Sequence, residues 1–152
     1  KIDQKEAQRY IEANLATHPL VRAFIDHTLA DGRERGYVMT LLGRRRYIPE
    51  LSMRNESDRS AGERIAANTP IQGSAADIVK VAMLRVDSAL REAGLASRML
   101  LQVHDELVLE VADGERAAVE ELVRREMGAA YELSVPLEVS VGYGRSWDQA
   151  AH

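Results

Sequence analysis

Apolar side chains recur at helical spacing in two stretches at the start of the chain, and each stretch predicts a helix. The first covers residues 3–16, where Asp3 as the N-cap and Glu6 three places on match a capping box. The second covers residues 19–35, with a proline in its first turn and Gly36 as its expected stop. The side chains expected on the buried face of this second helix are Val21, Phe24, Ile25 and Leu29.

The middle of the chain predicts one strand and one long helix. Residues 37–42 are rich in strand formers, and Gly43 then breaks the run. From about Ser57 to Glu92 the pattern is helical, with an interruption at Pro70. This proline removes a backbone hydrogen bond and clashes with the carbonyl of the preceding turn, so we expect a kink. The apolar residues expected in the core from this helix are Ile65, Ile71, Ala75, Ile78, Val79, Ala82 and Met83.

Two short apolar strands, residues 99–103 and 107–111, predict a β-hairpin in the last third of the chain. Its tip consists of His104, Asp105 and Glu106. The elements predicted after the hairpin are an amphipathic helix over residues 114–130 and a strand over residues 135–141. The expected fold class is therefore α+β, with helices packed on a small, mainly antiparallel sheet.

Composition narrows the classes of function. The 152 residues suit one domain or a large piece of one, and the absence of cysteine excludes disulfides, zinc–thiolate sites and thiol nucleophiles. No apolar run approaches the roughly 18 residues that a membrane span needs, and the N-terminus lacks the apolar stretch of a signal peptide. We expect no membrane association and a cytoplasmic location.

Charge is distributed unevenly along the chain. Residues 1–98 hold 16 Lys and Arg against 13 Asp and Glu, whereas residues 99–152 hold 4 against 11. The net charge of -4 argues against nucleic acid, but the basic first part is compatible with nucleic-acid contact on one side. Proteins that touch no nucleic acid also show such asymmetry, so composition leaves both possibilities open.

The hairpin tip is the first candidate site. Two neighbouring carboxylates, Asp105 and Glu106, repel each other beside apolar strands, and a divalent cation would offset that repulsion. Mg²⁺ prefers such hard oxygen ligands and usually keeps substrate phosphates in its shell. Phosphoryl transfer uses two such ions to align the attacking and leaving oxygens. The alternative is an ordinary hairpin with a solvated polar tip.

A row of hydrogen-bond donors on the long helix is the second candidate site. Arg64, Asn68 and Gln72 recur at intervals of four, which keeps them along one helix face. The DNA minor groove presents acceptors at similar positions in every base pair, so such a row could sense pair geometry without reading sequence. The alternative is a solvated polar face.

Three consecutive arginines, Arg44, Arg45 and Arg46, form the third candidate site. Adjacent guanidinium groups repel one another unless anions lie nearby, and arginine binds phosphate bidentately. Such contacts would anchor a duplex without reading its sequence. The alternatives are a solvated loop or ion pairs with nearby carboxylates, namely Glu50, Glu56 and Asp58.

The amino-acid sequences of these segments, and their order along the chain, resemble those of the family A DNA polymerases of bacteria. The resemblance covers nearly the whole chain. The resemblance rests on Gly-Tyr-Val at 36–38 with Thr-Leu-Leu-Gly-Arg-Arg-Arg-Tyr-Ile-Pro-Glu-Leu at 40–51, and on Glu-Arg-Ile-Ala at 63–66 with Asn-Thr-Pro-Ile-Gln-Gly-Ser-Ala-Ala-Asp at 68–77. It continues with Leu-Leu-Gln-Val-His-Asp-Glu-Leu-Val at 100–108 and Val-Ser-Val-Gly at 139–142. The ending from Gly142 to Asp148 is similar to the C-terminus of actinobacterial members.

The resemblance implies a role for each candidate residue. Asp105 would be a catalytic ligand of Mg²⁺ in the palm, with Glu106 as an accessory carboxylate near the metals. His104 would contact the primer end. Arg64, Asn68 and Gln72 would face the minor groove, and Arg46, with Arg45, would meet the DNA backbone. The partners would be primer–template DNA and deoxynucleoside triphosphates.

The resemblance also implies a domain assignment. Residues 1 to about 55 would be distal fingers and residues from about 56 to 152 palm, together the C-terminal part of a polymerase domain. The upstream palm with the first catalytic aspartate, the thumb and any exonuclease domain would precede this chain. The parent is expected to be a monomeric, nucleoid-associated DNA polymerase of replication and repair, and the fragment alone is expected to be inactive.

One segment departs from the pattern of the family. Family members usually carry Arg-Glu-Ala-Ala-Glu-Arg where residues 59–64 read Arg-Ser-Ala-Gly-Glu-Arg, and Gly62 should cost roughly 1 kcal/mol in a helix relative to alanine. Three other classes of protein are alternatives to a DNA polymerase. A non-catalytic DNA-binding module would give Asp105 no metal role, and a structural domain would leave the donor row unexplained. A single-subunit RNA polymerase usually has a small hydroxyl residue where this chain has Glu106.

Overall fold

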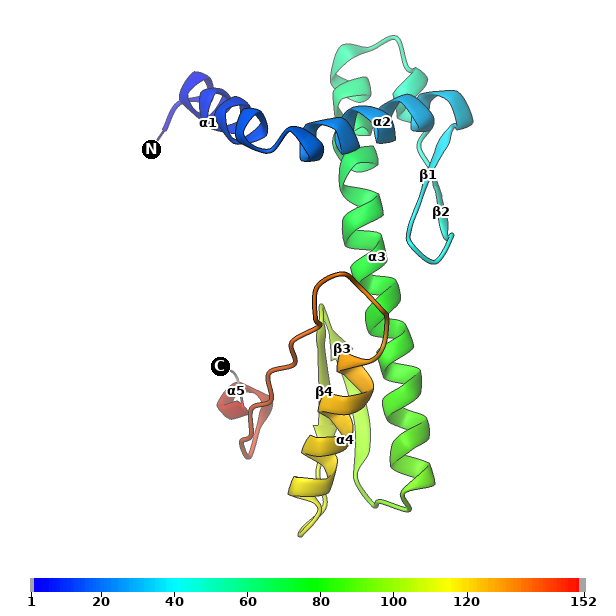
Figure 1. Ribbon diagram of the computed structural model, residues 1–152, viewed down its shortest axis with the longest axis vertical. Helices are drawn as coiled ribbons and strands as arrows, with labels where there is room; N and C mark the ends of the chain where they lie inside the picture. The colour runs from blue at the N-terminus through cyan, green and yellow to red at the C-terminus, as the bar shows by residue number, and fades with distance from the viewer. Residues whose placement is uncertain (1, 151–152) are drawn as a thin grey trace. The chain divides into compact units, whose positions relative to one another are not determined.

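The computed structural model describes residues 2–150, which form two compact units divided between Ser74 and Ala75 (Figure 1). Both units combine helices with one two-stranded antiparallel sheet. The predicted α+β class is confirmed, although the sheet is divided into two small ones. The assignment of fingers and palm to residues 1–55 and 56–152 stays a prediction.

The first two helices follow the predicted ranges closely. Helix α1 covers Gln4–Thr17, and the Asp3 carboxylate accepts a hydrogen bond from the Glu6 backbone N–H at 2.8 Å, which caps it as predicted. Helix α2 covers Pro19–Arg35 and ends at Gly36, whose φ of 76° places it in the left-handed region that glycine tolerates.

The predicted buried face of α2 is partly wrong. Val21 and Phe24 are 48% and 42% exposed, whereas Ile25 and Leu29 are half-buried and Thr28 is buried. Helical spacing identifies the face correctly, but burial also needs another element to cover that face. Within the described residues, the N-terminal half of this face stays largely exposed.

A small hairpin follows α2. Strand β1, Tyr37–Met39, pairs antiparallel with β2, Arg45–Tyr47, and the 3₁₀ turn η1 covers Pro49–Ser52. The strand predicted over residues 37–42 therefore ends early, because Leu41 and Leu42 form the connecting turn. The core of this unit consists of Val38, Ile48, Leu51 and Ala66.

Helix α3 runs unbroken from Glu56 to Glu92, through Pro70, and belongs to both units. The long helix predicted over residues 57–92 is therefore confirmed, and the kink expected at Pro70 stays a prediction. Thr69 and Ser74 each donate a side-chain hydrogen bond to the carbonyl four residues earlier, at Ile65 and Pro70. Ile71 was expected in the core but is 62% exposed.

The second unit is built around a longer hairpin. Strand β3, Arg98–Val103, pairs antiparallel with β4, Glu106–Glu110, as predicted, with Leu100 as an extra residue in the ladder. Helix α4 covers Arg116–Gly128, two residues shorter than predicted at each end. The buried core joins α3 to α4 and consists of Val86, Leu90, Val119, Leu122 and Val123.

The strand predicted over residues 135–141 is absent. This segment is irregular in the structure, and the short helix α5, Trp147–Ala150, follows it. Its alternation of apolar and polar side chains suits a strand, but a strand also needs a neighbour to bond its backbone. Here Arg124 of α4 donates to the carbonyl of Val139 instead.

Within residues 2–150, no helix is both long and apolar enough to cross a lipid bilayer.

Candidate functional site

The donor row of α3 and one arginine of β2 line a common hollow in the first unit. Arg46, Arg64, Asn68 and Gln72 surround an open cavity of about 330 Å³. All four side chains are exposed. Arg64 is held along the helix by a 3.1 Å hydrogen bond that its Nη1 donates to Ser60 Oγ. The structure thus brings together four of the residues predicted to contact DNA.

The three arginines of the run have different surroundings. Arg44 donates through Nη2 to the Gly73 carbonyl at 3.1 Å, which ties the β1–β2 hairpin to α3. The Arg45 guanidinium lies 4.8 Å from the centre of the Tyr37 ring, in a cation–π contact. Arg46 faces the hollow. Among the described residues, neither Arg45 nor Arg46 pairs with the carboxylates that were considered as alternatives.

The acidic hairpin tip lies in the second unit. His104 and Asp105 form a two-residue connection, and Glu106 is the first residue of β4, opposite Val103. His104 has a φ of 54°, which is uncommon for a residue with a side chain and is concentrated at functional sites. Gln102 Nε2 donates to the His104 carbonyl at 2.7 Å and fastens the tip. The turn is therefore narrow and held in place.

The side chains of the tip are exposed to solvent. His104, Asp105 and Glu106 are all exposed, and no described side chain donates a hydrogen bond to the Asp105 carboxylate. In the described part of the chain, no three His, Asp or Glu side chains come together as a complete metal site. Two adjacent carboxylates do fit Mg²⁺, because this ion is commonly held by one or two carboxylates together with substrate phosphates.

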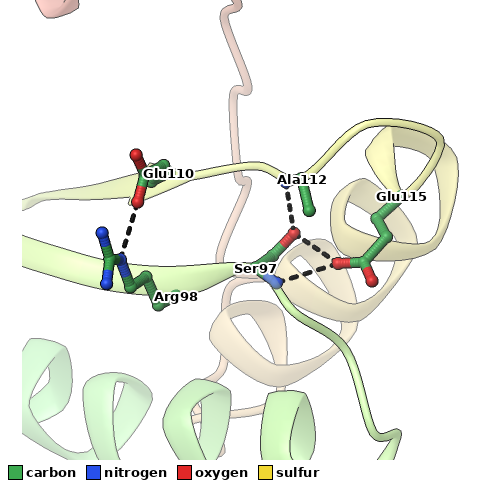
Figure 2. A network of polar contacts seen from close by, with 5 residues as sticks. All are labelled: Ser97, Arg98, Glu110, Ala112 and Glu115. Atoms are coloured by element: carbon green, nitrogen blue, oxygen red, sulfur yellow. Dashed lines mark hydrogen bonds and ion pairs between the residues drawn. The ribbon is translucent and has the colours of Figure 1, made fainter.

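The open end of the same hairpin is fastened by a polar network (Figure 2). The Glu115 carboxylate accepts from the Ser97 hydroxyl at 2.6 Å and from the backbone N–H groups of Ala96 and Ser97 at 2.9 Å. Ser97 Oγ in turn accepts from the Ala112 N–H at 2.9 Å. The hydrogen bonds to Glu115 lower its pKa below the ordinary value of 4.5, and the bond from the Ser97 hydroxyl has the largest effect. They connect the residues just before β3, just after β4 and at the N-cap of α4.

One residue at the tip was not predicted from sequence. Trp147 Nε1 donates to Glu106 Oε2 at 3.2 Å. The two residues are 41 positions apart, and no local pattern connects them. The one available signal is that Trp147 is the only tryptophan of the chain and lies in a glycine-rich tail.

A helix with an exposed row of donors beside an arginine, followed in the chain by an acidic hairpin, is the combination that the sequence resemblance implied. The chain belongs to DNA polymerase family A, and the model of that family matches residues 1–149.

Particular relatives agree with this assignment. The chain is 60% identical over 152 residues to DNA polymerase I of Mycobacterium tuberculosis and spans 17% of its length. It is 52% identical over 146 residues to the thermostable DNA polymerase I of Thermus aquaticus, and again spans 17% of it. Among solved structures it resembles the POL domain of Pol1 from M. smegmatis in complex with DNA primer-template and dNTP. That likeness has a TM-score of 0.93 and 56% identity, and covers 99% of this chain and 27% of the other.

Proposed function

We propose that this chain is the C-terminal part of the polymerase domain of a bacterial DNA-directed DNA polymerase that acts in replication and repair. Residues 1 to about 55 belong to the fingers and the remainder to the palm. The upstream palm, the thumb and any exonuclease domain lie in the rest of the protein. The family match over residues 1–149 supports this proposal, and so do the names of relatives of which the chain spans 17%.

The reaction is the transfer of a deoxynucleotide to a primer. The primer 3′-hydroxyl oxygen attacks the α-phosphorus of a deoxynucleoside triphosphate, a new P–O bond forms, and the bond to the β-phosphate breaks. Pyrophosphate leaves and the hydroxyl proton is lost. The observation that carries the proposal is the pair of carboxylates at the end of a rigid, fastened hairpin. Strands position such groups better than a loose loop would.

Asp105 and Glu106 would hold Mg²⁺ in this site. When bound, a pair of such ions stabilises the attacking and leaving oxygens of an in-line displacement. Two carboxylates cannot complete the shells of two ions, so further ligands would have to come from the substrate and from other parts of the polymerase. The 152-residue chain alone is therefore inactive.

The hollow of the first unit would receive the duplex. Arg64, Asn68 and Gln72 donate to acceptors in the minor groove near the new base pair, which favours correct pair geometry over any sequence. Arg46, with Arg45, contacts the phosphate backbone, and His104 contacts the primer end. The exposure of these side chains and the shared hollow of four of them support this role. Because its substrate would be DNA, we also propose that the parent is nucleoid-associated, and its monomeric state stays a prediction.

Replacement of Asp105 in the full-length polymerase tests the proposal. Asp105→Ala should lower primer extension with Mg²⁺ by at least about a hundredfold, because a lost metal ligand removes several kcal/mol of transition-state stabilisation. DNA affinity should change little. The matched control is Asp113→Ala, an exposed aspartate in the loop after β4, which should extend primers normally. Undiminished synthesis by Asp105→Ala would instead favour a non-catalytic DNA-binding module.

A further inference from the structure

The Glu106 carboxylate has one partner among the described residues, and that partner comes from the tail of the chain. Trp147 Nε1 donates to Glu106 Oε2 at 3.2 Å. Glu106 is exposed and its side chain has several rotatable bonds, so an unheld carboxylate would sample many positions. An indole N–H can only donate, which makes it a fixed partner for a charged acceptor.

The tail that carries Trp147 is fastened to α4 at two points. The Val139 carbonyl accepts from Arg124, which lies on α4. Four residues later, the Tyr143 hydroxyl donates to the Arg116 carbonyl at 3.2 Å, and the Arg116 guanidinium lies 3.9 Å from the centre of the Tyr143 ring. Burial of this ring raises the pKa of the Tyr143 hydroxyl. The tail is therefore anchored on the same unit that holds the hairpin.

The last turn of the tail is closely packed on itself. A Cβ atom at Gly144 would lie 2.6 Å from the Cβ of Gln149, so only glycine fits this position. The Arg145 N–H donates to Gln149 Oε1 at 3.2 Å, and the N–H groups of Gln149 and Ala150 donate to the Ser146 carbonyl. This turn begins α5 at Trp147 and sets the direction of the indole.

We propose that Trp147 is a positioning residue that orients the Glu106 carboxylate for nucleotide transfer. The inference rests on the proposed function, because it gives Glu106 a task at the reacting site. The anchored tail holds the Trp147 N–H in place. This N–H restricts the position of the Glu106 carboxylate, which follows Asp105 in the chain. Trp147 itself touches neither the substrate nor the reacting atoms.

A double-mutant cycle in the full-length polymerase tests this role. Trp147→Phe keeps an aromatic ring and removes the N–H, and it should lower kcat for primer extension by about three- to tenfold, in the range of one exposed hydrogen bond to a charged group. The KM for primer–template should not change, because DNA binding does not depend on Glu106. In a Glu106→Ala background the same substitution should have no further effect.

The outcomes separate the inference from the proposed function. If Glu106→Ala slows synthesis while Trp147→Phe does not, the positioning role is overturned and the proposed function stands. An equal loss from Trp147→Phe in both backgrounds also overturns it, because the tail would then act without Glu106. Full activity of Glu106→Ala removes the proposed task of Glu106 itself. The matched control is Asp148→Asn, in the same turn, because this side chain makes no hydrogen bond or ion pair with another described residue. A loss as large as that of Trp147→Phe would overturn the specific role of the N–H.

Discussion

Neighbouring residues of one type have different tasks in this chain, as the three arginines after β1 show. Arg44 fastens the hairpin to α3 through the Gly73 carbonyl, Arg45 stacks on Tyr37, and Arg46 faces the hollow with the donor row. Their sequence context is nearly identical, so their different surroundings could not be predicted from it. The alternation of side chains along β2 and the position of α3 decide which guanidinium reaches the hollow.

Arg46 therefore provides a test of DNA contact at the residue scale. Arg46→Ala in the full-length polymerase should weaken primer–template binding to a similar extent for different sequences, because a phosphate contact reads no bases. The slope of log affinity against log salt should fall in magnitude by about 1. Equilibrium binding at several salt concentrations measures both quantities.

The matched control for this test is Arg22→Ala. Arg22 is an exposed residue of α2 whose side chain makes no hydrogen bond or ion pair with another described residue. The substitution should leave the slope unchanged. An unchanged slope for Arg46→Ala would remove Arg46 from the DNA interface.

The position of Asp105 at the hairpin tip could be predicted, because apolar strands flank the polar triplet on both sides. The left-handed backbone of His104 could not be predicted, since it depends on how few residues the closed ladder leaves for the turn. The contact between Trp147 and Glu106 could not be predicted either, because the two residues are 41 positions apart and their contact depends on how the tail packs on α4.

At the scale of elements, Gly62 is explained by packing and not by helix propensity. A Cβ atom at this buried position would lie 2.8 Å from the Cβ of Glu50 and 3.0 Å from the backbone of Glu50 and Leu51. The glycine thus permits η1 to approach α3 closely. The sequence showed only the propensity cost, because the residues that pack against Gly62 are Glu50 and Leu51, which are distant from it along the chain.

Gly62→Ala should therefore destabilise the chain, although alanine is the better helix former. Overpacking typically costs 1–3 kcal/mol and the propensity gain is about 1 kcal/mol, so a net loss of about 1 kcal/mol is expected. Urea denaturation measures it. Gly128→Ala is the control, because a Cβ there would meet only the Leu137 carbonyl at an ordinary 3.5 Å. Greater stability of Gly62→Ala would contradict the close-packing explanation.

The Glu115 network predicts a dependence of stability on pH. Because folding lowers the pKa of Glu115, its ionised form stabilises the fold above its ordinary value of 4.5, and that contribution is lost as the pH falls through the lowered value. Glu115→Gln should lower the Tm at pH 7, and the difference from the natural chain should shrink below about pH 4.5.

Thermal unfolding across this pH range measures the effect. The control is Glu121→Gln, because Glu121 is an exposed residue of α4 whose side chain makes no hydrogen bond or ion pair with another described residue. A difference in Tm that stays constant down to pH 3 would show that the Glu115 charge does not stabilise the hairpin.

The four long helices and the second hairpin were predicted to within about two residues at each end, because their periodicity is long and their ends carry strong signals, whereas the short α5 was not predicted. The segment 135–141 was wrongly predicted as a strand for the opposite reason. Its short alternation is compatible with any extended segment, and pairing is decided by neighbours that a local pattern does not contain.

At the scale of the whole molecule, burial was the least predictable property. Large apolar side chains remain exposed on the first two helices and on α3. On these three helices, the apolar side chains with the largest exposed fractions are Leu20, Leu84, Ile71, Tyr10 and Ile11. Since the chain spans 17% of its mycobacterial relatives, we infer that other parts of the polymerase cover some of these surfaces.

The central claim is that the β3–β4 tip lies at the site of nucleotide transfer. The most direct measurement is the structure of the full-length polymerase with primer–template, incoming nucleotide and Mg²⁺. We expect an Asp105 carboxylate oxygen about 2.1 Å from an ion, beside the primer 3′ end. A structure in which Asp105 lies remote from every bound ion and from the primer end would contradict the claim.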